Sequence, residues 1–332
     1  MAILVSAGAL ASCATDAPAA QAAQMAPTGH RAQAGGSTVI VTLGTAGGPR
    51  PRTDRAQTAN LLIVNGTPYL IDVGANAVRR IQQSGTDFLQ ISRVFITHGH
   101  SDHTLGLPTL LATAWEFQRR EPIEIIGPPG TAKLTHDALQ FLSTNSEIRR
   151  SEGNPSPIEE IVKARDVAPG QVYEDKNVRV LAVENTHFNF GTSSPLSAKI
   201  KSYSYKFVTP DETVVFTGDT GPSPALERLA TGADVLVTEI GAAEELVAFY
   251  KANGTWQRKT EEEQREWLRH QHEEHLSAEA VGALAANAGV KRVILTHLIP
   301  VANEKVVYAD LKRRVQAVYK GDVVLAADLM RF

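Results

Sequence analysis

Short apolar runs recur along the chain from residue 37 onwards, and most of them are rich in Val, Ile and Leu. Runs of this length, bounded by Gly, Pro, Asn or Asp, predict buried β-strands. Asn65-Gly66 lies between two of them, and this dipeptide favours a tight hairpin. The expected strands are 37–43, 60–64, 69–72, 94–96, 123–126, 178–183, 203–208, 214–216, 235–237 and 293–295.

Segments that favour helix lie between the later strands. The expected helices cover 77–84, 109–119, 131–142 and 277–288, and residues 243–274 form a long, highly charged helical excursion. Residues 143–157 are expected to be irregular. Hairpins first, then strands alternating with helices, indicate an α/β fold in which helices cover a mixed sheet. We expect residues 37–332 to form a single domain.

The stretch that follows the strand at 94–96 is the most informative. It holds three imidazoles and one carboxylate within a few positions, in the order His98, His100, Asp102 and His103. Neutral imidazole is the commonest nitrogen ligand for metal ions in proteins, and a carboxylate supplies a harder oxygen. The stretch therefore predicts a metal site on a loop at a strand end.

Other expected strands also lead to a histidine or an acid, namely His187, Asp219, Glu239 and His297. Each has an ordinary explanation when taken alone: Asp219 suits a turn, and His297 suits a buried structural histidine. Their joint occurrence is more informative, because side chains at consecutive strand ends converge on one edge of a sheet. A rigid edge of this kind is the support that a metal site needs.

Composition narrows the classes of function. The chain has 332 residues, 43% of them hydrophobic, and a formal net charge of −3. It can therefore bury a large core, and its charge gives no reason to expect a nucleic-acid partner. No apolar run is long enough to cross a bilayer as a helix of the mature chain. Cys13 is the only cysteine, so a metal site in the domain must use His, Asp or Glu.

The first 36 residues have a composition of their own. An apolar segment leads to Leu10-Ala11-Ser12-Cys13, which resembles the lipobox of bacterial lipoproteins, in which the cysteine is acylated, although no basic residue precedes it. Residues 1–13 would be a lipoprotein-type signal segment, and 14–36 a flexible tether. We expect an exported, periplasmic protein that meets the membrane only through this lipid anchor. An ordinary cleaved signal peptide and a cytosolic location are the alternatives.

The series from His98 to His103 matches the H-x-H-x-D-H signature of the metallo-β-lactamase superfamily, which the chain resembles from about residue 38 to its end. The resemblance implies a four-layer α/β/β/α sandwich with the site along one edge. It also implies two divalent metal ions, zinc in the first place, with manganese or iron as alternatives. The implied ligands are His98, His100 and His187 for one ion, Asp102, His103 and His297 for the other, and Asp219 as the bridge.

Within the superfamily, the chain looks most like the RNase Z and arylsulfatase-like branch. Leu43-Gly44-Thr45, Asp72-Val73-Gly74 and the segment 217–222 resemble that branch. Glu239 and His275 match the places where RNase Z keeps a Glu and a His that protonate the leaving group. The arm that clamps tRNA in RNase Z is not recognisable, so we expect no nucleic-acid substrate. Asp219 and the lack of a cysteine ligand argue against a dedicated β-lactamase.

The same residues suggest a mechanism. Two metal ions can hold a hydroxide and polarise an ester oxygen, and Asp102 would orient the hydroxide. His275, oriented by Glu239, would protonate the leaving oxygen; the alternatives are a solvated His275 and a Glu239 that supports a ligand histidine. Phe188 and Phe190 follow His187 and are expected to contact the substrate, with core packing as the alternative.

The expected function is therefore a metal-dependent hydrolase of a small ester, in the first place a phosphodiester. An arylsulfatase or a lactonase on the same scaffold is the alternative, and a β-lactamase or a non-catalytic surface lipoprotein is less favoured. The excursion at 243–274 separates Glu239 from His275, so we expect it near the site. The residues set no oligomeric state, and the resemblance is compatible with a dimer.

Overall fold

The structure is a computed structural model, and it describes residues 38–154, 156–190 and 194–332. The part from residue 38 onwards forms one compact unit. The predicted signal segment at 1–13, the predicted lipidation of Cys13 and the predicted tether at 14–36 lie outside the described residues. Among the helices of the described part, none is both long and apolar enough to cross a membrane.

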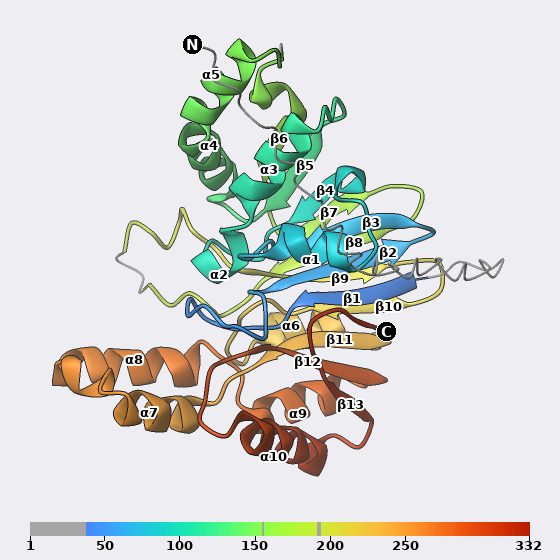
Figure 1. Cartoon of the computed structure of the whole chain (residues 1–332). Helices are drawn as coiled ribbons and strands as arrows, with labels where there is room; N and C mark the ends of the chain where they lie inside the picture. Colours follow the sequence, from blue (N-terminus) through green and yellow to red (C-terminus); the bar gives the residue numbers. More distant parts are fainter. Residues whose placement is uncertain (1–37, 155, 191–193) are drawn as a thin grey trace, which may run out of the picture. The chain divides into compact units, whose positions relative to one another are not determined.

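Two seven-stranded sheets form the centre of this unit (Figure 1). The predicted hairpin is confirmed: Val64 pairs with Thr67, and Asn65 and Gly66 have φ values of 51° and 78°, which suit a two-residue turn. The first sheet has the order β14 (Met330–Arg331), β1 (Thr38–Gly44), β2 (Ala59–Val64), β3 (Thr67–Ile71), β4 (Arg93–Phe95), β5 (Ile123–Gly127) and β6 (Val162–Asp166).

The second sheet brings several predicted site residues to one edge. Strands β10, β11 and β12 are parallel neighbours, so their carboxyl ends meet there and carry Asp219, Glu239 and His297. The order of this sheet is β13 (Asp322–Leu325), β12 (Arg292–Leu298), β11 (Val235–Ile240), β10 (Thr213–Phe216), β9 (Tyr203–Val208), β8 (Arg179–Glu184) and β7 (Gly170–Glu174).

Helices cover the outer faces of both sheets (Figure 1). Apolar side chains of α1 (Ala77–Gln83), α3 (Leu107–Glu116) and α4 (Thr131–Phe141) share a buried cluster with the first sheet. Those of α6 (Pro224–Ala230), α9 (Ala278–Ala288) and α10 (Glu304–Val318) share another with the second. The layers therefore follow the order helix, sheet, sheet, helix, and the predicted α/β/β/α sandwich is confirmed.

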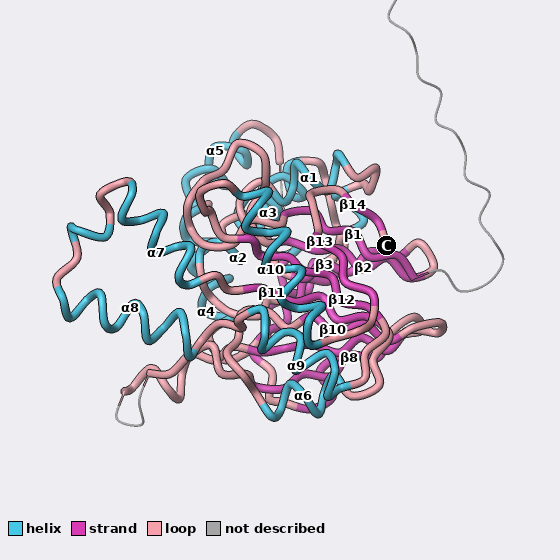
Figure 2. Tube along the Cα trace, turned by 90° about the horizontal axis from the view of Figure 1, so that it is seen from below, coloured by secondary structure: helices cyan, strands magenta, loops and turns pink. Residues whose placement is uncertain are grey.

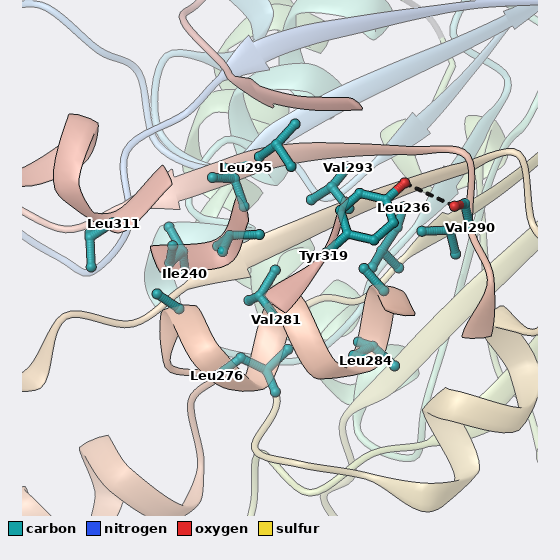
Figure 3. Packing of buried hydrophobic residues seen from close by; sticks show 14 of the residues in the cluster. Leu236, Ile240, Leu276, Val281, Leu284, Val290, Val293, Leu295, Leu311 and Tyr319 are labelled. Carbon is teal, nitrogen blue, oxygen red and sulfur yellow. Dashed lines mark hydrogen bonds between the residues drawn. The ribbon is translucent and has the colours of Figure 1, made fainter. Parts of the chain in front are cut away.

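Apolar packing holds the layers together. Aromatic side chains of β4, β9 and β10 meet edge to face between the sheets. Figure 3 shows the cluster between α9 and the second sheet, to which Leu236 of β11 and Val281 of the helix both belong. Tyr319 is buried in the same cluster and donates its hydroxyl to the carbonyl of Val290 at 2.8 Å, so its polar end is paired. Full burial of a Leu or Val side chain contributes roughly 1.5–3 kcal/mol.

Two predicted segments differ from the structure. The segment 143–157, predicted to be irregular, contains α5 (Ser143–Ser151). The charged excursion at 243–274 is two helices, α7 (Ala243–Ala252) and α8 (Glu261–Glu273), with the short 3-10 turn η3 (Trp256–Arg258) between them. Helix α7 ends at Asn253-Gly254, where Gly254 adopts a φ of 77° that suits a helix end. Figure 2 shows the two helices projecting as a pair from the other described elements.

Candidate metal centre and its dyad

The histidine-rich stretch lies directly after β4, and part of it is helical. His98 and His100 follow the strand, whereas Asp102 and His103 lie in the one-turn helix α2 (Ser101–Thr104). The carbonyl of His100 accepts hydrogen bonds from the backbone N–H of His103 at 3.1 Å and from the hydroxyl of Thr104 at 2.9 Å. The predicted loop is therefore a strand end that turns at once into a helix.

Three imidazoles meet at the first predicted metal position. Nε2 of His98 lies 3.1 Å from Nδ1 of His100, and Nε2 of His187 lies 3.0 Å from the same atom. His187 follows β8 and arrives from the second sheet. His98 and His187 are fully buried, whereas His100 is exposed. The position is thus reached from solvent on the side of His100.

The second predicted position lies beside the first. Nε2 of His297 is 3.2 Å from Oδ2 of Asp102 and 3.1 Å from Oδ2 of Asp219. Nε2 of His103 is 3.3 Å from Oδ1 of Asp219, whose Oδ2 is also 3.9 Å from Nε2 of His98. Asp219 therefore lies between the two groups, where the bridge was predicted. Within each group, one ligand-type atom per residue lies within 4.8 Å of the others.

Hydrogen bonds from outside the cluster turn two of these imidazoles towards its centre. His103 donates from Nδ1 to Oδ2 of Asp72 at 2.8 Å. His98 donates from Nδ1 to the hydroxyl of Thr97 at 3.0 Å, and that hydroxyl donates to Asp72 at 2.8 Å. Because the outer nitrogen of each ring donates a hydrogen bond, the inner nitrogen of the neutral ring is the one that offers a lone pair to a metal ion.

Asp72 belongs to the site although no role was predicted for it there. Asp72 follows β3 with a φ of 57°, a left-handed conformation that is uncommon for residues other than glycine but that Asp tolerates. Its side chain also accepts the backbone N–H of Thr97 at 2.7 Å. Two sequence features could have indicated this role: Asp72 is an acid directly after a buried strand, and its segment resembles the RNase Z branch.

The charges of the two groups differ. Burial lowers the pKa of His98 and that of His187 well below their ordinary value. Burial acts in the same direction on His103 and His297, but the facing carboxylates outweigh it. The pKa of His103 lies well above its ordinary value, and that of His297 rises to about 10. Burial in turn would raise the pKa of Asp219, yet His297 and His103 hold it well below its ordinary range. Without metal, the first group is neutral and the second is a cluster of opposite charges.

The residues present fit a pair of divalent metal ions. His103 Nε2 and Asp219 Oδ1 are buried, and although they lie 3.3 Å apart, neither makes a hydrogen bond within the described residues. Buried polar atoms in proteins are almost always paired. In the first group, the lone pairs of two buried imidazoles converge on one nitrogen of His100, where a single hydrogen serves only one of them well. A cation at each position satisfies these atoms. Imidazole and carboxylate ligands without thiolate suit zinc, manganese or iron.

Glu239 and His275 form a hydrogen-bonded pair next to the cluster. His275 donates from Nδ1 to Oε2 of Glu239 at 2.6 Å, and Glu239 is buried in β11. Burial lowers the pKa of His275. The charge of Glu239, its hydrogen bond and the charge of Asp219 together outweigh this effect, so the pKa of His275 lies above its ordinary value. Oε2 of Glu239 is 4.0 Å from Nδ1 of His297, too far for a hydrogen bond to this predicted ligand. The geometry therefore favours the predicted dyad over a Glu239 that supports a ligand histidine.

His270 is a second residue to which the sequence analysis gave no role. It lies in the last turn of α8, with Nε2 3.3 Å from Nε2 of His275 and Nδ1 2.8 Å from Oε2 of Glu274. The carbonyl of Glu274 accepts a hydrogen bond from Nδ1 of His187 at 3.0 Å. The end of the excursion therefore lies beside the cluster, to which the carbonyl of Glu274 links it.

Two large cavities border the cluster, and His100 and His270 line both of them. The larger one, of about 770 Å³, has mostly apolar walls that include Phe188 and Phe190; we name it the apolar chamber. The smaller one, of about 360 Å³, contains His275 together with aromatic side chains of α7 and α8; we name it the dyad chamber. The predicted metal centre is therefore accessible to a substrate from two chambers.

Phe188 and Phe190 form an aromatic wall beside the first metal position. Their rings are stacked with centres 5.0 Å apart, and the ring of Phe188 stands edge-on to those of His98 and His100 at 5.6 and 5.2 Å. Both phenylalanines are half-buried and line the apolar chamber. This placement favours the predicted substrate contact over core packing.

Comparison with known proteins identifies the family. The model of the family described as "Beta-lactamase superfamily domain" matches residues 67–298, which include every predicted metal ligand. The chain belongs to the metallo-β-lactamase superfamily. With the buried cluster of histidines and aspartates, this membership makes it a metal-dependent hydrolase of the superfamily.

Relatives in sequence are ribonucleases. The chain is 28% identical over 299 residues to Ribonuclease Z of Methanosarcina mazei. The alignment covers 78% of this chain and 87% of the relative. It is 30% identical over 298 residues to Ribonuclease Z of Mycolicibacterium paratuberculosis, with 88% of this chain and 97% of the relative covered. The predicted similarity to RNase Z is thus confirmed as a distant homology.

Solved structures agree on the fold. The metallo-β-lactamase fold protein YhfI from Bacillus subtilis matches with a TM-score of 0.64 and 17% identity, over 89% of this chain and 98% of that protein. The short form of human tRNase Z matches with a TM-score of 0.58 and 21% identity, over 89% of this chain and 98% of that protein. Yeast PDE1 matches with a TM-score of 0.60 and 15% identity, over 88% of this chain and 98% of that protein.

Proposed function

We propose that this member of the superfamily hydrolyses a small phosphodiester with the help of two divalent metal ions, in the first place zinc. One observation carries the proposal: the His275–Glu239 pair stands beside the predicted ligands, with His275 within 4.8 Å of His187 and Asp219 through ligand-type atoms. A diester with an alkoxide leaving group needs a proton donor at that oxygen in addition to an activated nucleophile. The site offers both within one cluster.

The chain's own side chains prepare the attack. A metal pair, when bound, supplies an activated water and polarises the oxygens of the substrate. Asp219 lies between the two positions and would offset the repulsion between the cations. Asp102 is fixed by the backbone N–H of Gly48, which donates to its Oδ2 at 2.7 Å. The Asp102 carboxylate is thus fixed facing the cluster, where it would orient the attacking water.

The dyad serves the leaving group. His275 keeps Nδ1 on Glu239, so Nε2 carries the proton that can be transferred, and the ring lines the dyad chamber. Nε2 of His270, 3.3 Å away, would hold this proton until a substrate oxygen takes its place. The phosphorus–oxygen bond to the leaving group breaks as Nε2 gives its proton to that oxygen, and the alcohol then departs through the dyad chamber. Glu239 stabilises the protonated imidazole beforehand and fixes its orientation.

Two other substrate classes compete with this proposal. Because the matched relatives are ribonucleases, RNA is the second candidate, and its phosphodiester bond asks for the same chemistry. An arylsulfatase or lactonase would use the same ligands on another ester. A β-lactamase or a non-catalytic surface protein is less favoured, since the full ligand set and the dyad are both present.

A substrate panel tests the proposal. The metal-loaded protein is offered bis(4-nitrophenyl) phosphate, 4-nitrophenyl sulfate, a lactone, a β-lactam and a precursor tRNA with a 3′ extension. We expect the highest kcat/KM for the phosphodiester among the small esters. Preference for the sulfate or the lactone would overturn the proposal in favour of those activities. Cleavage of the tRNA with no turnover of the small diester would establish the second candidate instead.

A further inference from the structure

The apolar chamber differs in chemistry from the rest of the site. Its walls are built from leucine, isoleucine, proline and phenylalanine side chains of α3, α4 and the segment that follows β8. Leu105 and Leu196 belong to this lining and are 57% and 47% exposed. An apolar surface that borders a catalytic cluster and stays open to solvent is characteristic of a substrate pocket.

The charged side chains of the chamber are neutralised by neighbours. Among the described lining residues, the lysines and the arginine are Lys133, Lys201 and Arg269. Lys133 pairs with Asp137 at 2.5 Å, Lys201 with Glu184 at 2.7 Å, and Arg269 with Glu274 at 2.8 Å. The chamber therefore presents little net positive charge to a polyanion, whose binding would rely on such cations.

The position of the dyad determines which part of a substrate the chamber receives. His275 lines the dyad chamber and is not part of the apolar lining, whereas His100 lines both. The oxygen that accepts the proton of His275 must lie on the dyad side. The substituent on the apolar side is then the one that remains attached to phosphorus after hydrolysis.

We propose that the apolar chamber binds an uncharged hydrocarbon or aryl substituent of the substrate, the one retained on the phosphoryl group. This inference rests on the proposed phosphodiesterase function and names its substrate class: a mixed diester with a bulky apolar group on one side. The stacked Phe188 and Phe190 supply the wall nearest to the predicted metal ligands. The volume of about 770 Å³ is ample for a ring or a medium alkyl chain.

The test compares two diesters that share one leaving group, 4-nitrophenyl phenyl phosphate and 4-nitrophenyl methyl phosphate. Only the retained substituent differs, and each rate is divided by its uncatalysed rate. We expect the metal-loaded full chain to prefer the phenyl diester in kcat/KM by about tenfold or more, because the ring leaves water on binding. If the ratio of the two kcat/KM values, each divided by its uncatalysed rate, is close to one, the inference is overturned, whereas the phosphodiesterase function is unaffected.

Two variants place the effect in the chamber. Leu134→Gln changes the α4 wall, and Leu196→Gln changes an exposed position outside the buried apolar clusters. Each should reduce the phenyl-to-methyl preference at least about threefold, as expected when apolar surface in the pocket is replaced by an amide. Val306→Gln, at a 70% exposed position on α10, is the matched control and should leave the preference unchanged. An unchanged preference in both chamber variants would contradict the assignment.

A binding measurement separates the inference from the proposed function. The neutral fluorescent probe N-phenyl-1-naphthylamine is titrated into the metal-loaded full chain. We expect saturable binding that weakens several-fold in Leu134→Gln and Leu196→Gln but not in Val306→Gln. Absence of binding, or equal binding by all variants, would overturn the chamber's role. If neither diester is hydrolysed while the probe binds as expected, the phosphodiesterase function fails and the apolar site stands.

Discussion

Asp72 holds His103 from outside the predicted metal cluster, with its Oδ2 2.8 Å from Nδ1 of the imidazole and both side chains buried. The same carboxylate fixes Thr97, which in turn orients His98. One residue that is itself no metal ligand therefore orients an imidazole in each of the two groups.

Asp72→Asn should weaken metal binding while the fold is kept, because Asn also tolerates the left-handed backbone of this position. Loss of the carboxylate removes the charge that orients His103, and such changes cost about 10–100-fold in metal affinity. Competition with a chromophoric chelator measures the affinity. Asp310→Asn is the control, because this half-buried carboxylate of α10 pairs with Arg313 and with none of the predicted ligands. Equal affinities in both variants would remove the orienting role of Asp72.

Asp219→Ala should reduce the bound metal from two equivalents to one or fewer and abolish turnover. The reason is geometric: Asp219 reaches His103 and His297 on one side and comes within 3.9 Å of His98 on the other. Elemental analysis of the dialysed variant gives the metal content. Retention of two equivalents would show that Asp219 is no bridge.

His275→Ala should keep both metal ions and lose activity selectively. A 4-nitrophenolate group departs without help, whereas an alkoxide needs a proton, so the loss in kcat should be at least about tenfold larger for an alkyl leaving group. Turnover of matched aryl and alkyl diesters measures this difference. Equal losses on both substrates would refute the general-acid role.

Glu239→Gln should shift the alkaline limb of the kcat/KM profile to lower pH. The Glu239 carboxylate raises the pKa of His275 against the opposing effect of burial, and the amide removes that charge. The protonated, active form of His275 is then lost at a lower pH than in the parent. A pH–rate profile of the variant with an alkyl diester records the shift. An unmoved or higher alkaline limb would contradict the dyad.

Metal binding at pH 8 should release protons, and mainly from the second position. Without metal, facing carboxylates keep His103 and His297 protonated, with a pKa of about 10 for His297, whereas His98 and His187 are already neutral. Because ligand imidazoles must be neutral, affinity at the second position should rise as the pH rises towards 10. Calorimetry in buffers of different ionisation enthalpy counts the protons. No net release would contradict these charge states.

The ligands were predictable because each follows a recognisable strand. His187, Asp219 and His297 come after short apolar runs that are easily recognised as buried strands. The ends of neighbouring strands meet at one edge of a sheet, and this does not depend on the exact bounds of the connecting helices. The fold followed from the same pattern together with the signature of His98 to His103. Side-chain roles that depend on tertiary contacts did not follow, and His270 is an example: nothing local distinguishes it from His272 on the same charged helix.

Elements with mixed patterns were predicted poorly. Strand β6, Val162–Asp166, alternates apolar and charged residues at the edge of its sheet, and helix α5 has almost no apolar face. The excursion was predicted as one helical stretch because its charged residues mask the break, which Gly254 creates by its positive φ. For β6 and α5 the tertiary environment, and not the local sequence pattern, determines the structure.

The most direct test of the account is an activity titration with metal. The protein is stripped with a chelator and dialysed, zinc is added in known equivalents, and hydrolysis of bis(4-nitrophenyl) phosphate is followed alongside bound metal. We expect no turnover without metal and a rise that reaches its plateau at two bound equivalents, in line with the two groups of ligand-type side chains around Asp219. Full activity of the metal-free protein would contradict this expectation.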